Sequence, residues 1–60
     1  MNWYWLSCER FTILVGCEDE TIVECPPIAR RFKGQRLINL TRWMRTLGGY
    51  QTCYLGTYDA

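Results

Sequence analysis

The segment from Gln35 to Leu47 constrains the fold most, because its apolar residues recur with the period of an α-helix. Spacings of three and four residues define one apolar stripe, which consists of Leu37, Leu40, Met44 and Leu47, with Thr41 among them. Polar residues fall on the opposite side, so a helix here would bury one face and expose the other. Gly48-Gly49 follows and favours a left-handed C-cap. We therefore predict an amphipathic helix over residues 35–47.

The segments before and after this helix are rich in aromatic and β-branched residues, which favour β-strands. Residues 3–7 and 11–17 predict either one long strand bent near Cys8-Glu9 or two strands in tandem. Residues 21–25 resume the pattern after the acidic run Glu18-Asp19-Glu20, and this interruption predicts a hairpin. Residues 50–55 predict a last strand, and residues 56–60 a loose tail.

The acidic run allows two hairpin registers. A three-residue loop over 18–20 places Val15 opposite Val23 and Ile13 opposite Cys25, whereas a two-residue turn at Asp19-Glu20 pairs Val15 with Glu24. We favour the three-residue loop, because it keeps the glutamate away from the apolar face. That face would contain Phe11, Ile13, Val15, Cys17, Val23 and Cys25, and the other face would contain Leu14 and Ile22.

On the first strand, Trp3 and Trp5 project to one side, which we expect to pack against the helix. Tyr4 and Leu6 would then face outward or into a dimer interface. Pro26-Pro27 should end the strand predicted over residues 21–25. The same prolines suit the start of a short helical turn over residues 28–32, which Gly34 should break. Residues 1–60 thus predict a single α+β domain in the order β-β-α-β, with one amphipathic helix packed on a small antiparallel sheet.

The small size of the chain favours a partner subunit. A chain of 60 residues hides only about 60% of its unfolded surface, so such domains usually need disulfides, a metal or oligomerisation. Three Trp, four Tyr and two Phe are more large rings than one minimal core encloses easily. We interpret this excess as an indication of self-association.

The four cysteines, Cys8, Cys17, Cys25 and Cys53, leave three states open. Their even number suits a disulfide framework in a secreted chain, but the first residues lack the pattern of a signal peptide. The sequence contains no Cys-x-x-Cys pair, which is the spacing that structural zinc sites commonly use. We favour buried, reduced thiols in a cytoplasmic protein, with neither a metal nor a cofactor.

The residue types argue against catalysis. The chain has no His, which is the usual general base near neutral pH, and its single Ser therefore has no imidazole to activate it. Cys17 precedes Glu18-Asp19-Glu20, and this negative charge should suppress thiolate formation. We predict a protein that is not an enzyme, with no catalytic residue and no small-molecule substrate. No apolar run approaches the roughly 20 residues that cross a bilayer, so we expect no membrane partner.

Charge is strongly separated along the chain, although the net charge is only +1. Residues 1–25 contain five acidic residues against one arginine, and residues 26–60 contain six basic residues against one aspartate. Phe32 and Trp43 are interleaved with the basic residues. The predicted binding residues are Arg30, Arg31, Lys33, Arg42, Trp43 and Arg45.

Two interpretations of this basic region compete. Arg30 and Arg31 follow Pro27 at a helix start, where an anion would be favoured, so the region could contact phosphates of a nucleic acid while Trp43 stacks on a base. Alternatively, the arginines pair with the acidic hairpin of the same chain or of a partner subunit. The low net charge slightly favours a protein partner. For Trp43 itself, packing at the edge of the apolar stripe is the simpler expectation.

The run from Pro26 to Gln35, followed by Leu37, Leu40, residues 42–45 and Gly48-Gly49, resembles short uncharacterised proteins encoded by phages and mobile elements of bacteria. The Trp/Tyr-rich start is similar as well, so the resemblance covers most of the chain. It implies a small accessory or regulatory factor that acts by binding. Our leading hypothesis is a non-enzymatic, homodimeric interaction module that binds a protein partner, and the alternative is a nucleic-acid-binding protein.

Overall fold

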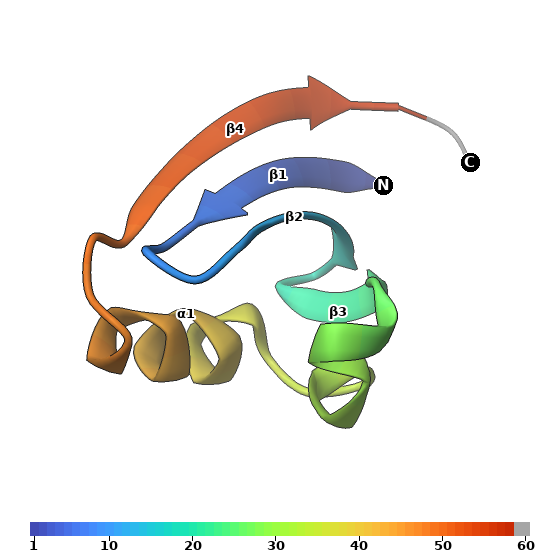
Figure 1. The fold of residues 1–60 in the computed structure, drawn as a ribbon. Coiled ribbons are helices and arrows are strands. Elements are labelled where there is room, and N and C mark those ends of the chain that lie inside the picture. Colours follow the sequence, from blue (N-terminus) through green and yellow to red (C-terminus); the bar gives the residue numbers. More distant parts are fainter. Residues whose placement is uncertain (59–60) are drawn as a thin grey trace.

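The computed structural model describes residues 1–58 and confirms the α+β class, with three strands, two helical segments and a last strand in sequence order. The elements are β1 (Asn2–Ser7), β2 (Thr12–Glu18), β3 (Thr21–Glu24), the 3-10 helix η1 (Pro27–Phe32), α1 (Leu37–Thr46) and β4 (Gln51–Thr57). The strands form one antiparallel sheet in the order β3-β2-β1-β4. Figure 1 shows that η1 and α1 lie on the same side of this sheet, so its other face is open.

The first two strands form a hairpin. Pairing joins Asn2 to Cys17 and Ser7 to Thr12, and the amide of Cys8 donates to the carbonyl of Phe11 at 2.9 Å to close the connecting turn. Of the two arrangements expected for these residues, the single bent strand is therefore wrong, and two consecutive strands are found. The chain reverses because the residues near Cys8 and Glu9 form a tight turn, not a bend.

The turn between β2 and β3 also differs from the favoured prediction. Asp19 and Glu20 form a two-residue turn with φ of +50° and +65°, and Cys17 lies opposite Ile22. Positive φ at both central residues is the geometry of a type I′ hairpin. The register then shifts, because Val23 is the extra residue of a β-bulge that brings Gly16 opposite Glu24. The bulge brings Glu24 opposite Gly16 and so avoids the Val15–Glu24 pair that had favoured the three-residue loop. The two-residue turn itself pairs Ile22 with the buried Cys17, so Ile22, not Val23, lies in the core.

The first strand presents the opposite face from the one expected. Leu6 is fully buried and Tyr4 packs against the core, whereas Trp5 is 43% exposed. Leu6 pairs with Ile13 and Tyr4 with Val15, so all four share the face of the sheet that packs against the helix. Leu14 lies on the other face, as predicted, and is 40% exposed. The alternation was right, but both sides of this strand are apolar, so periodicity alone does not choose between them.

The segment between β3 and α1 covers the outer edge of β3. The 3-10 helix begins at Pro27 and ends before Gly34, whose φ is +85°. The amide of Gly34 donates to the carbonyl of Ile22 at 2.8 Å, and the amide of Ile22 donates to the carbonyl of Gln35 at 2.9 Å. These bonds satisfy backbone groups that an edge strand would otherwise expose.

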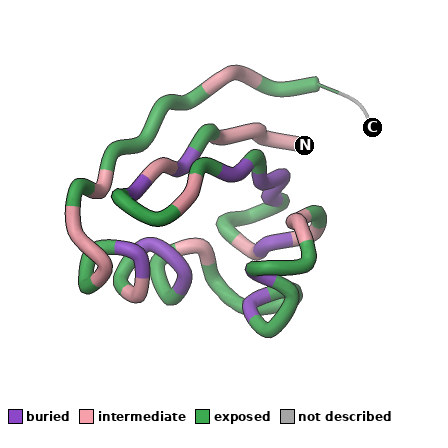
Figure 2. The backbone as a smooth tube through the Cα atoms, in the orientation of Figure 1, coloured by how far each residue is buried: buried purple, intermediate pink, exposed green. Residues whose placement is uncertain are grey.

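The helix α1 confirms the predicted stripe. Leu40 and Met44 are fully buried, Leu37 and Leu47 pack against the core, and the buried hydroxyl of Thr41 donates to the carbonyl of Ile38 at 3.2 Å. Gly48 and Gly49, at φ of +90° and +67°, end the helix in the left-handed conformation. The core lies between α1 and the lower face of the sheet, and Figure 2 shows its buried segments gathered there.

The last strand is longer than predicted. It runs from Gln51 to Thr57, so Gly56 and Thr57 belong to the sheet and not to the tail, and residues 59–60 of that tail lie outside the described residues. It pairs with β1 and forms one edge of the sheet. Figure 2 shows that no part of β4 is buried. The helix therefore covers β1 and β2 but leaves β4 open on both sides.

Candidate functional site

The structure divides the predicted binding residues among three sides of α1. Trp43 lies on the flank toward β2 and η1, Arg45 lies on the opposite flank toward β4, and Arg42 is exposed between them. Arg30 and Lys33 are exposed on or beside η1. The sequence interpretation treated these residues as one basic surface, whereas only Arg31 and Trp43 come together.

Arg31 and Trp43 lie in a groove of about 590 Å³ on the η1 flank of the helix, which we call the basic-aromatic groove. Its walls are Arg10, Phe11, Ile28, Arg31, Trp43 and Leu47. The Trp43 ring centre lies 5.8 Å from that of Phe11 and 5.5 Å from that of Phe32. This cluster confirms that Trp43 packs at the edge of the stripe. The tryptophan also lines the groove.

The guanidinium of Arg31 lies over these rings. Its central carbon lies 4.6 Å from the Trp43 ring centre and 4.8 Å from that of Phe32. Such cation–π contacts hold the guanidinium near the rings and leave its N–H groups available to an acceptor. In residues 1–58, no carboxylate forms an ion pair with either Arg31 or Arg10. The groove therefore combines an apolar floor with two positively charged walls.

Sequence reasoning missed Arg10 and Phe11 as members of this groove. They reach it because the β1–β2 turn is tied to the end of the helix: the amide of Glu9 donates to the carbonyl of Gly48 at 2.9 Å. The side chains of Leu47 and Phe11 then line the same groove. The only local signal was that Arg10, which follows Glu9, is the single basic residue of the first 25.

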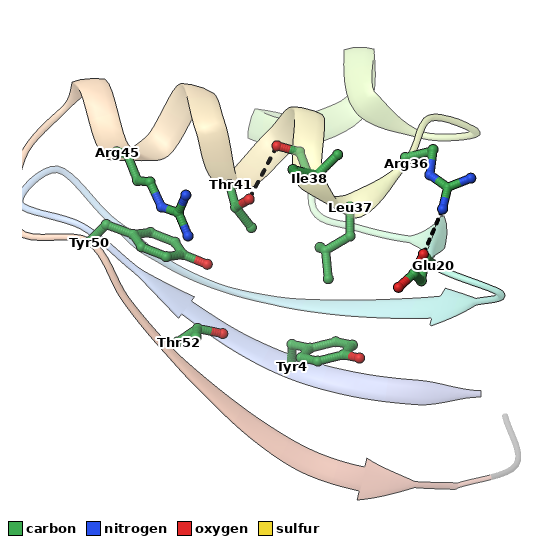
Figure 3. Close-up of a pocket in the computed structure, with 9 residues that line it drawn as sticks. All are labelled: Tyr4, Glu20, Arg36, Leu37, Ile38, Thr41, Arg45, Tyr50 and Thr52. Carbon is green, nitrogen blue, oxygen red and sulfur yellow. Dashed lines mark hydrogen bonds and ion pairs between the residues drawn. The ribbon is translucent and has the colours of Figure 1, made fainter.

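A second cleft, of about 480 Å³, separates the opposite flank of α1 from β1 and β4 (Figure 3). Arg45 lies over Tyr50 at one end, with 5.2 Å between the guanidinium carbon and the ring centre. At the other end Arg36 donates to Glu20 at 2.6 Å. Figure 3 shows Tyr4 and Thr52 on the strands, across the cleft from Leu37 and its neighbours on the helix. Burial, followed by the charges of Cys17, Tyr54 and Glu20, raises the pKa of Tyr4.

The expected pairing between the acidic hairpin and the basic half is found at one position. Arg36 and Glu20 form the ion pair, but both side chains are mostly exposed, so it contributes little to stability. Within the described part of the chain, no other arginine or lysine lies within ion-pair distance of a carboxylate. Most of the basic side chains are thus not neutralised inside the subunit.

The cysteines are free thiols that occupy different environments. Cys8 and Cys17 are buried, Cys25 is half-buried and Cys53 is exposed. Burial raises the pKa of the Cys17 thiol, which lowers its thiolate fraction near neutral pH. No group of three or more cysteines and carboxylates gathers into a possible metal site over residues 1–58.

Over the same residues, no helix is both long and apolar enough to cross a membrane. Comparisons with protein-family models, with curated proteins and with solved structures found no match to this chain. The resemblance to short phage and mobile-element proteins therefore stays a prediction.

Proposed function

We propose that this protein is a non-enzymatic interaction module that binds a protein partner through the basic-aromatic groove and works as a homodimer. The observation that carries the proposal is the pair of arginines, Arg10 and Arg31, beside an apolar floor that includes Phe11 and Trp43. The matching partner is a peptide segment that places aspartate or glutamate next to large apolar side chains.

The state of Arg31 supports this partner chemistry. A guanidinium held over two rings loses less freedom on binding than one that moves freely, because its position is already restricted. Its free N–H groups suit a carboxylate in a two-point contact, and hydrogen bonds of this charged kind are worth about 1.5–3 kcal/mol. The apolar floor adds burial of a neighbouring Leu, Ile or Phe side chain. Affinity would thus come from both parts together.

Nucleic-acid binding, the alternative prediction, has less support from the same geometry. Arg36 and Arg45 face the second cleft, away from Arg31, so the basic residues do not follow one path along a phosphate backbone. Arg31 already covers the Trp43 ring that would stack on a base, and Phe11 and Phe32 pack against it as well. The net charge of +1 is also low for such a protein.

Selection from a random-peptide display library on the immobilised full chain tests the proposal. We expect enriched peptides to pair an acidic residue with a large apolar one, and a synthetic consensus peptide to bind in calorimetry. Arg31→Gln and Arg10→Gln should each weaken that binding about tenfold or more. Arg36→Gln is the matched control, because it removes the same charge on the far flank and should leave the affinity unchanged.

The contrary results are equally specific. Enrichment without acidic residues, or equal affinity in Arg31→Gln, would exclude the groove as the binding site. In a parallel assay with a labelled single-stranded oligonucleotide, we expect weak binding. Tight binding that falls steeply with salt, and that Arg30→Gln or Arg42→Gln reduces, would favour the nucleic-acid function instead.

A further inference from the structure

The open face of the sheet is unusually apolar for a surface. Strand alternation places Trp3 and Trp5 of β1 on this face, next to Leu14 of β2 and Cys53 of β4, because Trp5 pairs with both Leu14 and Cys53. Within residues 1–58, no helix covers this face (Figure 1). None of these side chains carries a charge. An antiparallel sheet with one solvated face normally carries polar residues there, so the pattern needs an explanation.

The exposed apolar area on this face is large for a molecule of this size. Trp5 is 43% exposed, Leu14 40% and Tyr58 59%. Since a large aromatic side chain carries about 150–250 Å² of surface, these three side chains expose on the order of 300 Å². That is the size of the largest patch on a typical monomer, yet the whole molecule exposes only 4050 Å².

The face also has a defined shape. A hollow of about 270 Å³ is lined by Trp3, Leu14, Leu55 and Tyr58. Trp5, beside Leu14 and on the same side of β1 as Trp3, forms no part of its wall and remains partly exposed. A projecting indole and an apolar hollow thus lie next to each other. If two copies meet at this face around a two-fold axis, Trp5 of each copy lies over the hollow of the other copy. A two-fold dimer needs this self-complementarity.

We infer that this open face is the homodimer interface, in which Trp5 of each subunit enters the hollow formed by Trp3, Leu14, Leu55 and Tyr58 of a second copy. The inference rests on the homodimer proposed above and assigns its interface to the open face of the sheet. A stable interface buries about 800 Å² per partner, roughly a fifth of the area this chain exposes, with an apolar centre and a polar rim. The aromatic patch supplies the centre, and Ser7, Thr12 and Gln51 on the same face supply a rim.

Electrostatics favours a second copy as the occupant. The residues of the patch carry no charge, and the two carboxylates of this face, Glu18 and Glu24, lie toward its β2–β3 edge. The apolar centres of two identical faces therefore meet without like charges between them, whereas the groove used for the partner peptide lies on the covered side of the sheet. A dimer through the open face would therefore leave both basic-aromatic grooves accessible. Two such grooves would allow bivalent binding of a partner that carries two acidic segments.

The test compares the unmodified 60-residue chain with three variants by sedimentation velocity and light scattering at micromolar concentrations. We expect a dimer for the unmodified chain, and a dissociation constant at least tenfold weaker for Trp5→Thr and Leu14→Thr. Ile38→Gln is the matched control: Ile38 is 52% exposed on the helix, away from this face, and its loss should not change the dimer. Circular dichroism reports whether each variant is folded.

A second measurement needs no variant. Cys53 is exposed and lies beside Trp5 on the open face, so dimer formation should slow its alkylation by a maleimide as the protein concentration rises. A dimer of unchanged affinity in Trp5→Thr would overturn this interface but not self-association. So would an alkylation rate of Cys53 that does not depend on protein concentration while the chain dimerises. A strictly monomeric chain would overturn both, whereas peptide binding by the groove is tested separately.

Discussion

The ring of Trp3 lies across Gly16 on the neighbouring strand: a Cβ built on this glycine would stand 3.0 Å from two of the ring carbons and would also meet the sulfur of Met1. Trp3 and Gly16 are cross-strand partners, so the absent side chain of one makes room for the indole of the other. The glycine is needed for contact and not for a left-handed backbone, because its φ is not positive.

Gly16→Ala should therefore destabilise the fold by about 1–3 kcal/mol, the usual cost of overpacking. Urea unfolding, at concentrations below the range of dimer formation, measures this change. In the background of Trp3→Thr the same substitution should cost clearly less, because the ring that opposes the new methyl group is gone. An equal cost in both backgrounds would show that Trp3 is not the obstacle.

Met44→Ala should destabilise the fold by about 2–5 kcal/mol, because Met44 is fully buried between α1 and the sheet and its truncation leaves a cavity. Ile38→Ala on the same helix should change the free energy of unfolding by about 0.5 kcal/mol or less, since its side chain is 52% exposed. Chemical denaturation of both variants compares them directly. Similar losses would contradict the orientation of the helix on the sheet.

Glu20→Gly should stabilise the hairpin turn. Glu20 has a φ of +65°, a left-handed conformation that costs a residue with a Cβ about 1–2 kcal/mol and costs glycine little. The substitution also removes the exposed ion pair with Arg36, worth about 0–1 kcal/mol, so we expect a net gain of up to about 1 kcal/mol in unfolding experiments.

Two controls separate the contributions at this turn. Arg36→Gln removes the ion pair alone and should cost no more than a few tenths of a kcal/mol. Glu18→Gly places a glycine in the extended strand β2 and should destabilise by about 0.5–1 kcal/mol. If Glu20→Gly and Glu18→Gly lose stability to the same extent, Glu20 does not adopt the left-handed conformation described for this turn.

Stability should fall in the alkaline range. Burial raises the pKa of Cys17 above 9.0, and burial with nearby charges raises the pKa of Tyr4 above 10.0. The folded state then holds these protons more tightly than the unfolded state, so stability is fully present below about pH 9 and is lost as the pH rises through the folded pKa values. Urea midpoints should decline above that pH, and Cys17→Ala and Tyr4→Phe should each flatten the decline. A profile unchanged by both substitutions would contradict this origin.

The sequence alone determined the elements of this fold. The helix over residues 37–46 follows from a period of three and four residues and from the glycines after it, and the strands follow from aromatic and β-branched runs. These are short-range properties of the backbone and its neighbouring side chains, so they can be inferred without knowing what lies opposite. The fold class followed from the order of these elements.

Tertiary structure decided the faces, the register and the candidate site. Leu6 and Trp5 are both apolar, and only the fit beneath α1 buries Leu6 and leaves Trp5 exposed. The bulge at Val23 depends on the turn at Asp19-Glu20, a choice that the pattern of residues 18–25 left open. Arg10 joins Arg31 and Trp43 because the β1–β2 turn meets the end of the helix. Each outcome depends on contacts between residues far apart in the chain, which local periodicity does not encode.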